Sequence, residues 1–170
     1  MSGEIRPLQS QFWSRSIDLN GDTYAVNVNV SEDEKGMPVR LKIDNGKEYV
    51  RSFNTNGAGF PFSVPGATIN YQQGFSGGNL DWADKDYQLV SAHEIGHPIL
   101  TLAAGREYSW SHEGTSGTLG GDNGTYAPVP KTGEMNLMKY YEDASVNMRY
   151  ARSIASESDV KNLIYISKRH

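Results

Sequence analysis

The chain has 170 residues, a formal net charge of −4 at pH 7 and no cysteine. This length fits one domain with a sizeable core, and the lack of cysteine excludes disulfides and metal sites built from thiolate ligands. The acidic balance argues against a nucleic-acid partner, and no apolar stretch approaches the ~20 residues that a membrane span needs.

The beginning of the chain predicts a short tail followed by one domain. Residues 1–10 are mostly polar and read as a tail or linker, and residues 11–170 are expected to form a single domain. Met1 leads directly into polar sequence, with no secretory signal peptide. The start therefore resembles a boundary within a longer protein.

Two hairpins are expected in the N-terminal third. Apolar residues alternate on both sides of Asn20-Gly21 and again around Asn45-Gly46, where the strands would be 39–43 and 49–53. Asn-Gly between alternating runs is a strong hairpin signal. Residues 18–22 also resemble the start of a calcium loop, but the later glycine and the bidentate glutamate are missing. The sequence thus favours a small antiparallel sheet.

A further strand is expected at Ala67–Tyr71. Near a catalytic site, such a strand can bind an extended peptide that adds to the sheet edge. It can equally be one more strand of the sheet, and the sequence does not separate these interpretations.

The segment Ser91–His97 carries the pattern H-E-x-x-H. On a helix, positions four apart share one face, so His93 and His97 can bind a single metal ion. Glu94 lies too close to His93 to bind the same ion, but it can remove a proton from a metal-bound water. The competing interpretation is a pair of core histidines satisfied by hydrogen bonds. The spacing and the intervening glutamate favour metal.

The ends of this helix are also predicted. Asp84 or Asp86 is expected to cap its N-terminus. Pro98 lacks the amide that would bond to the Glu94 carbonyl, so a kink or break is expected just after His97.

The C-terminal half should contain a long loop, a second helix and a strand. Residues 106–133 are rich in glycine and show no periodicity, so they form either a lid over the site or a disordered loop. An apolar stripe predicts a helix from about Asn136 or Lys139 to Ala155, and Leu163–Ile166 should be a strand. The predicted fold is α+β, with the N-terminal hairpins packed against the H-E-x-x-H helix and a C-terminal helix.

A catalytic zinc ion usually has three protein ligands and one position open to water, so a third ligand is required. Ala103 stands where the extended H-E-x-x-H-x-x-G-x-x-H pattern would place a third histidine. Glu142 is the preferred ligand, because it lies in an apolar column between Met138 and Val146, where an unpaired charge is costly to bury. The alternative is an exposed acidic residue near a helix start, favoured by the helix dipole.

Other residues compete for roles in the site. Glu134, His112 and Asp143 are rivals of the preferred third ligand. His112, Tyr140 and Tyr141 are candidates to donate a hydrogen bond to the oxyanion of a tetrahedral intermediate. The sequence alone does not rank these oxyanion candidates.

The motifs resemble the zincin metallopeptidases. The His93–His97 helix, followed by Glu142-Asp143-Ala144, resembles the gluzincin branch. Asn136-Leu137-Met138 is similar to the methionine turn beneath the metal in metzincins. The chain therefore mixes features of both branches.

A narrower resemblance covers roughly residues 86–150. The segments His93–Thr101, Tyr108–Trp110 and Asn136–Glu142 are similar to the C-terminal metallopeptidase domain of VgrG spike proteins of the type VI secretion system. The resemblance implies a toxin domain that is normally fused to the spike, acts in the periplasm of a rival bacterium and has a cognate immunity protein.

The resulting expectation is a zinc-dependent peptidase that acts as an antibacterial effector. His93, His97 and Glu142 would bind one zinc ion, and Glu94 would be the general base. Two other functions stay open: a non-catalytic metal-binding or adhesive module of a spike protein, and a zinc amidase that acts on cell-wall peptides.

Overall fold

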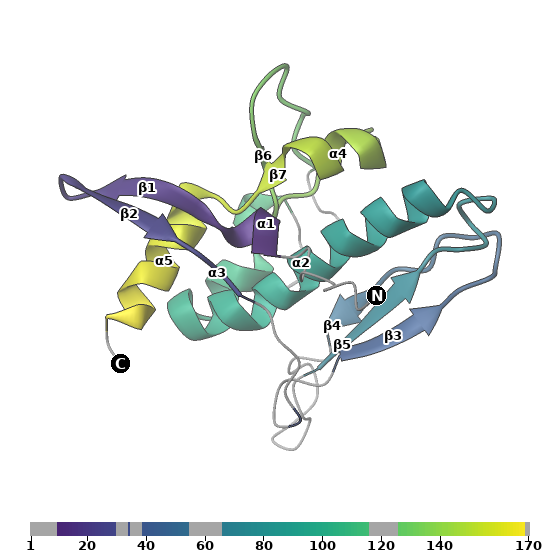
Figure 1. The fold of residues 1–170 in the computed structure, drawn as a ribbon, viewed down its shortest axis with the longest axis horizontal. Coiled ribbons are helices and arrows are strands. Elements are labelled where there is room, and N and C mark those ends of the chain that lie inside the picture. Colours follow the sequence, from purple (N-terminus) through teal and green to yellow (C-terminus); the bar gives the residue numbers. More distant parts are fainter. Residues whose placement is uncertain (1–9, 30–33, 35–38, 55–65, 116–125, 169–170) are drawn as a thin grey trace, which may run out of the picture.

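The computed structural model describes residues 10–29, 34, 39–54, 66–115 and 126–168. They adopt the α+β arrangement expected from the sequence (Figure 1). In chain order the elements are α1 (Ser10–Trp13), β1 (Arg15–Leu19), β2 (Asp22–Val26), β3 (Val39–Ile43), β4 (Phe53–Asn54), β5 (Ala67–Tyr71), α2 (Leu80–Ala104), α3 (Arg106–Trp110), the 3-10 helix η1 (His112–Gly114), β6 (Met135–Asn136), α4 (Val146–Arg152), β7 (Ser153–Ile154) and α5 (Glu157–Ser167).

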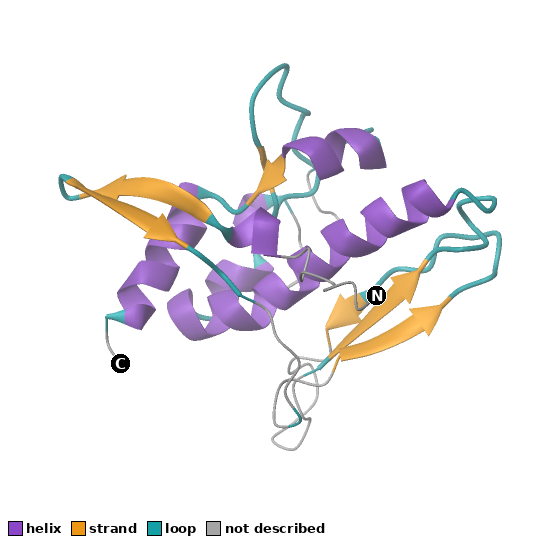
Figure 2. Ribbon diagram, in the orientation of Figure 1, coloured by secondary structure: helices purple, strands orange, loops and turns teal. Residues whose placement is uncertain are grey.

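The 25-residue helix α2 is the element around which the others pack. It contacts β4 and β5 of the three-stranded sheet as well as α1, α3, α4 and α5 (Figure 2). Asn79 caps its N-terminus by accepting a hydrogen bond from the Trp82 amide at 3.1 Å, and Gly105 ends it with φ 91°. The predicted caps Asp84 and Asp86 are wrong, since both residues lie inside the helix. No described helix combines the length and the apolar character needed to cross a membrane.

The predicted break after His97 is also wrong, because α2 continues through Pro98 to Ala104. Proline lacks the amide that would bond to the Glu94 carbonyl. That carbonyl instead accepts a hydrogen bond from Asn54 Nδ2 at 3.0 Å. A side chain of β4 therefore replaces the missing helical donor and connects the sheet to the H-E-x-x-H segment.

The first predicted hairpin is confirmed. β1 and β2 pair antiparallel, with Leu19 opposite Asp22. Asn20 and Gly21 have φ values of 57° and 90°, as the tight turn at the end of such a hairpin requires. Among the described residues no group of metal ligands includes Asp18 or Asp22.

The second predicted hairpin is wrong, because β3 and β4 both pair with β5. β3 runs parallel to β5 and β4 antiparallel, which gives the strand order β3-β5-β4. The strand predicted at Ala67–Tyr71 is confirmed as β5. It lies at the centre because Ala67 and Ile69 are buried in the core and β5 packs on α2. An extended peptide therefore cannot add to it as an edge strand.

The C-terminal predictions differ most from the structure. The helix expected up to residue 155 is confined to α4, which starts after its N-cap Ser145. The backbone amide of Glu142 donates to the Ala127 carbonyl at 3.0 Å, and Asp143 has φ 49°, so this stretch is not helical. The strand expected at Leu163–Ile166 is part of the helix α5.

Local capping explains why α5 is a helix. The Ser156 and Asp159 side chains each bond to the other residue's backbone amide, which forms a capping box. Val160 and Ile164, four residues apart, are buried in the core. Four consecutive apolar residues do not by themselves distinguish strand from helix.

The predicted loop at residues 106–133 is partly helical. It begins with α3 and η1, and residues 116–125 lie outside the described part. The predicted alternatives, a lid or a disordered segment, concern residues 116–125 and so lie outside the described residues.

The core beneath α2 leaves no room for a side chain at Gly96. A Cβ atom there would lie 2.4 Å from Trp13 Cζ2 and 2.8 Å from Met138 Sδ. The Trp13 indole also donates to the Ala92 carbonyl at 3.0 Å. Glycine at this position lets α1 and the segment after β6 pack directly against the helix surface between the two motif histidines.

Candidate metal centre

Three buried histidines converge at the middle of α2. His93 and His97 lie one turn apart on α2, and His112 begins η1. One ring nitrogen from each lies within 4.8 Å of those of the other two. The residues are 5%, 3% and 2% exposed. The three side chains form a compact cluster that can hold one metal ion.

Hydrogen bonds fix the ring orientation of His93 and His112. His93 Nδ1 lies 3.0 Å from the Leu137 carbonyl, and His112 Nδ1 lies 2.8 Å from the Trp110 carbonyl. A carbonyl only accepts hydrogen bonds, so each Nδ1 carries the proton and each Nε2 presents its lone pair.

The same tautomer follows for His97. The Ser109 hydroxyl donates to the His97 carbonyl at 2.8 Å, so its oxygen is available to accept from His97 Nδ1 at 3.2 Å. Metal-binding histidines generally donate their other ring N–H to an oxygen in this way. All three rings therefore offer Nε2.

Burial keeps these histidines neutral. It lowers the pKa of His97 to about 3 and that of His112 to about 4, and it lowers the pKa of His93 well below its usual value. The neighbouring imidazoles lower the pKa of His93 and His97 further. Nε2 of His93 and Nε2 of His112 are buried without a hydrogen-bond partner. An unpaired buried nitrogen is costly, and a bound metal would satisfy both atoms.

Aromatic rings enclose the cluster. Trp110 stacks on His97 with ring centroids 4.8 Å apart. Tyr140 stacks on His112 at 4.5 Å and on His93 at 5.5 Å. These rings restrict the rotation of the imidazoles.

Glu94 follows His93 directly in α2 and is 8% exposed. The Asn54 side chain donates both to its carboxylate and to its backbone carbonyl. Burial raises the pKa of Glu94 to about 7, against the opposing effects of Arg51 and the Asn54 hydrogen bond. A carboxyl group with a pKa near neutrality is suited to accept and return a proton.

The preferred third ligand, Glu142, is not brought to the cluster. Its side chain is exposed in a turn. Among its rivals, Glu134 forms an exposed ion pair with Arg15 at 3.1 Å, and Asp143 is also exposed. Of the residues considered, only His112 joins His93 and His97. The structure therefore brings His112, and not Glu142, to the two motif histidines.

The structure distinguishes two of the oxyanion candidates, Tyr140 and Tyr141, by their contacts. Tyr140 lies against the histidines. The Tyr141 hydroxyl accepts a hydrogen bond from the Asn136 amide at 2.7 Å instead.

One feature of the sequence indicates the third histidine: the chain has four histidines, and His112 is the only one besides the motif pair that precedes the C-terminal residue.

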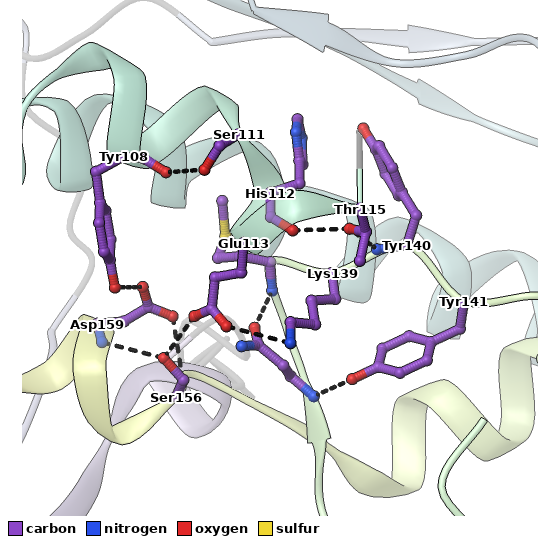
Figure 3. A network of polar contacts seen from close by, with 12 residues as sticks. Tyr108, Ser111, His112, Glu113, Thr115, Lys139, Tyr140, Tyr141, Ser156 and Asp159 are labelled. Carbon is purple, nitrogen blue, oxygen red and sulfur yellow. Dashed lines mark hydrogen bonds and ion pairs between the residues drawn. The ribbon is translucent and has the colours of Figure 1, made fainter. Parts of the chain in front are cut away.

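The backbone at His112 adopts a conformation that few residues other than glycine tolerate. His112 and Glu113 both have φ 49°, and each such residue costs on the order of 1–3 kcal/mol. The Thr115 hydroxyl donates to the His112 carbonyl at 2.7 Å and accepts from the Tyr140 amide at 3.0 Å (Figure 3). These bonds connect His112 to Tyr140 through Thr115.

Glu113 stabilises this turn from the other side. Its carboxylate accepts from the Ser156 hydroxyl at 2.9 Å and lies 3.5 Å from Lys139 Nζ (Figure 3). The contacts join η1 to the cap of α5 and to the segment that follows β6. Glu113 thus helps to hold His112 in its unusual conformation.

We expect Glu113→Ala to weaken metal binding by roughly tenfold, because groups that hold metal ligands in place contribute at about this level. The affinity can be measured by competition with a chromophoric chelator. Glu107→Ala, an exposed change in α3, is the matched control and should leave the affinity unchanged. Equal affinities for the two variants would contradict this role of Glu113.

Comparison with known proteins gives no relative for the chain. No protein-family model, curated protein or solved structure matches it. Its function must therefore be inferred from the residues and contacts of the candidate metal centre.

Proposed function

We propose that the protein is a zinc-dependent peptidase in which His93, His97 and His112 bind one zinc ion. The observation that carries the proposal is the convergence of three buried, neutral imidazoles beside Glu94. Each Nδ1 is occupied by an oxygen acceptor. This donor set fits zinc, which binds imidazole nitrogen in tetrahedral sites.

Three protein ligands favour a catalytic site over a structural one. Structural zinc sites have four protein ligands, whereas catalytic sites keep one position for water or substrate. A zinc ion bound in this way acts as a Lewis acid and lowers the pKa of its bound water to about 7. Among the described residues no fourth histidine or carboxylate joins the cluster.

Glu94 and Tyr140 have distinct roles in this proposal. Glu94 accepts the proton of the attacking water and then donates it to the leaving amine. Burial raises the pKa of Tyr140 above its usual value, so the phenol keeps its proton at neutral pH. Arg51 donates to the phenol oxygen at 2.7 Å, which leaves the phenol proton free to stabilise a developing oxyanion.

The substrate is proposed to lie along β4. β4 occupies one edge of the described sheet, and its residue Asn54 is bonded to Glu94. An extended peptide can add to such an edge through backbone hydrogen bonds. The peptide-binding edge that we propose is therefore β4 and not β5.

The experiment that tests the peptidase proposal measures metal and activity in one preparation. We expect one zinc ion per chain by elemental analysis and cleavage of a quenched-fluorescent peptide library. Chelation should abolish cleavage, and added zinc should restore it. A folded protein that binds zinc but cleaves nothing would favour the non-catalytic module, and cleavage restricted to cell-wall peptides would favour the amidase.

We further propose that the peptidase is an antibacterial effector, fused to a type VI spike and active in the periplasm of the target cell. The support is the motif resemblance to VgrG metallopeptidase domains over residues 86–150. Expression with a periplasmic leader should arrest growth, whereas the same chain kept in the cytoplasm and the His93→Ala variant should not. Equal growth of all three strains would contradict the effector role. The cognate immunity protein would be recognised as a partner that restores growth.

A further inference from the structure

Arg51 places a positive charge beside the candidate metal centre. Its Nη2 atom donates to the Tyr140 hydroxyl at 2.7 Å, and its Cζ atom lies 5.5 Å from the centroid of the Tyr140 ring. Tyr140 in turn stacks on His112 and His93. The Arg51 side chain is nevertheless exposed. The guanidinium is therefore next to the site and open to solvent.

Within the described part of the chain, no carboxylate forms an ion pair with Arg51. Arg51 is absent from the ion pairs among the described residues, which involve Arg15, Lys85 and Lys139. Glu94 is near enough for Arg51 to lower its pKa, but its carboxylate is bonded to Asn54. A guanidinium has several N–H donors in a planar fork. Donors beyond the one used by Tyr140 remain for a ligand.

The backbone that carries Arg51 is held firmly. The Asn70 side-chain amide donates to the Arg51 carbonyl at 2.9 Å, and the Asn70 backbone amide donates to Ser52 Oγ at 2.9 Å. Gln72 Oε1 accepts from the Val50 amide at 3.1 Å. Asn70 and Gln72 are 2% and 1% exposed. The buried amides of Asn70 in β5 and of Gln72 just after it thus extend the pairing of β4 and fix the position of Arg51.

We propose that Arg51 binds a carboxylate of the substrate, so that the enzyme prefers peptides with a carboxylate close to the scissile bond. This inference rests on the proposed peptidase function. A guanidinium binds carboxylate with two parallel hydrogen bonds, which gives geometric specificity. The carboxylate is either the side chain of an acidic residue or a free C-terminus. Both have the same chemistry, and the experiment separates them.

The test uses matched peptides that differ only in this charge. One series of quenched-fluorescent nonapeptides carries a single Glu at successive positions, and its twin series carries Gln. A further pair of peptides, the third set, differs only in ending with a free carboxylate or with an amide. We expect kcat/KM to favour the acid over its amide twin by roughly tenfold or more at one position. A preference in the first two series identifies a side chain, and one in the third pair identifies a C-terminus.

Variants of Arg51 then assign the preference. In Arg51→Gln the ratio of kcat/KM for the acid peptide to kcat/KM for its amide twin should fall to about one. Arg51→Lys should keep part of the preference for the acid, since lysine retains the charge but not the planar fork of donors. Arg40→Gln, an exposed change in β3, should keep the full ratio. A wild type without acid preference, or a ratio that survives Arg51→Gln, would overturn the proposal. An equal loss of kcat/KM for the acid and the amide peptides in Arg51→Gln would also overturn it, because Arg51 would then act only by positioning Tyr140.

A binding measurement keeps this inference separate from the peptidase proposal. The same peptide pairs are titrated calorimetrically onto the zinc-loaded wild type and Arg51→Gln. If the wild type cleaves no peptide but binds the acid forms more tightly, and Arg51→Gln does not, the peptidase proposal fails and the Arg51 site stands. If the wild type cleaves both twins equally and binds them equally, the Arg51 site fails and the peptidase proposal stands.

Discussion

Glu94→Gln is expected to leave one zinc ion bound per chain and to lower peptide hydrolysis by roughly 10³-fold. Glu94 is 8% exposed, and burial raises its pKa to about 7. Glutamine has nearly the same shape and can keep its side-chain oxygen against Asn54, but it cannot accept a proton from water. Zinc content and kcat on a quenched-fluorescent peptide are the two measurements.

The control for this experiment is Glu107→Gln, which removes an exposed carboxylate from α3. It should match the wild type in both zinc content and kcat. Full activity in Glu94→Gln would refute the role of Glu94 as general base. Loss of zinc from Glu94→Gln would show instead that the carboxylate supports the metal site, and the fall in activity would then say nothing about proton transfer.

The correct fold predictions depend on short-range signals. The hairpin around Asn20-Gly21 follows from the backbone that these two residues adopt, and the helix that carries His93 and His97 follows from the H-E-x-x-H spacing. The second hairpin failed because β3 is paired with a strand more than twenty residues further along the chain. The Asn45-Gly46 signal gives no information on such a partner, which depends on the packing of β5 against α2.

Helix ends were the other source of error. The apolar stripe up to residue 155 has the right period, but Asp143 at φ 49° and the bridge of Ala127 to Tyr141 prevent a helix before Ser145. The capping box that starts α5 uses Asp159 in place of the commoner glutamate, and it precedes a short apolar run. A strand and a helix are equally compatible with such a run.

Three of the four residues His93, Glu94, His97 and His112 could be predicted from spacing alone. His93, Glu94 and His97 are related by helix geometry, which the sequence specifies directly. The third histidine reaches the cluster through a turn with φ 49° at His112, and contacts with distant residues hold that turn. The sequence favours Glu142 only if its segment is a helix, and the segment is a turn in which Glu142 is exposed.

At Pro98 a contact from a distant strand overrides the local rule that proline ends a helix. A proline inside a helix predicts a break because one carbonyl loses its donor. Here Asn54 supplies the donor to the Glu94 carbonyl and also binds the Glu94 carboxylate. The same amide therefore preserves the helix, positions the proposed general base and connects it to the edge strand proposed to bind substrate.

His112→Ala is expected to lower zinc affinity by more than roughly 100-fold and to abolish hydrolysis. Removing a group that merely supports a ligand costs about 10–100-fold, and His112 is proposed to be a ligand itself. Its Nε2 atom is buried without a partner, and its Nδ1 is bonded to the Trp110 carbonyl. The affinity is measured by chelator competition, with circular dichroism to establish that the variant is folded.

Glu142→Ala is the decisive comparison, because sequence reasoning favoured Glu142 and the geometry favours His112. Glu142 is exposed, so its variant should keep one zinc ion and wild-type kcat/KM. The opposite result, with zinc lost from Glu142→Ala and retained in His112→Ala, would require the segment 137–145 to move toward α2 when metal binds. It would also free His112 for oxyanion stabilisation, and His112→Ala would then lower kcat without changing zinc content.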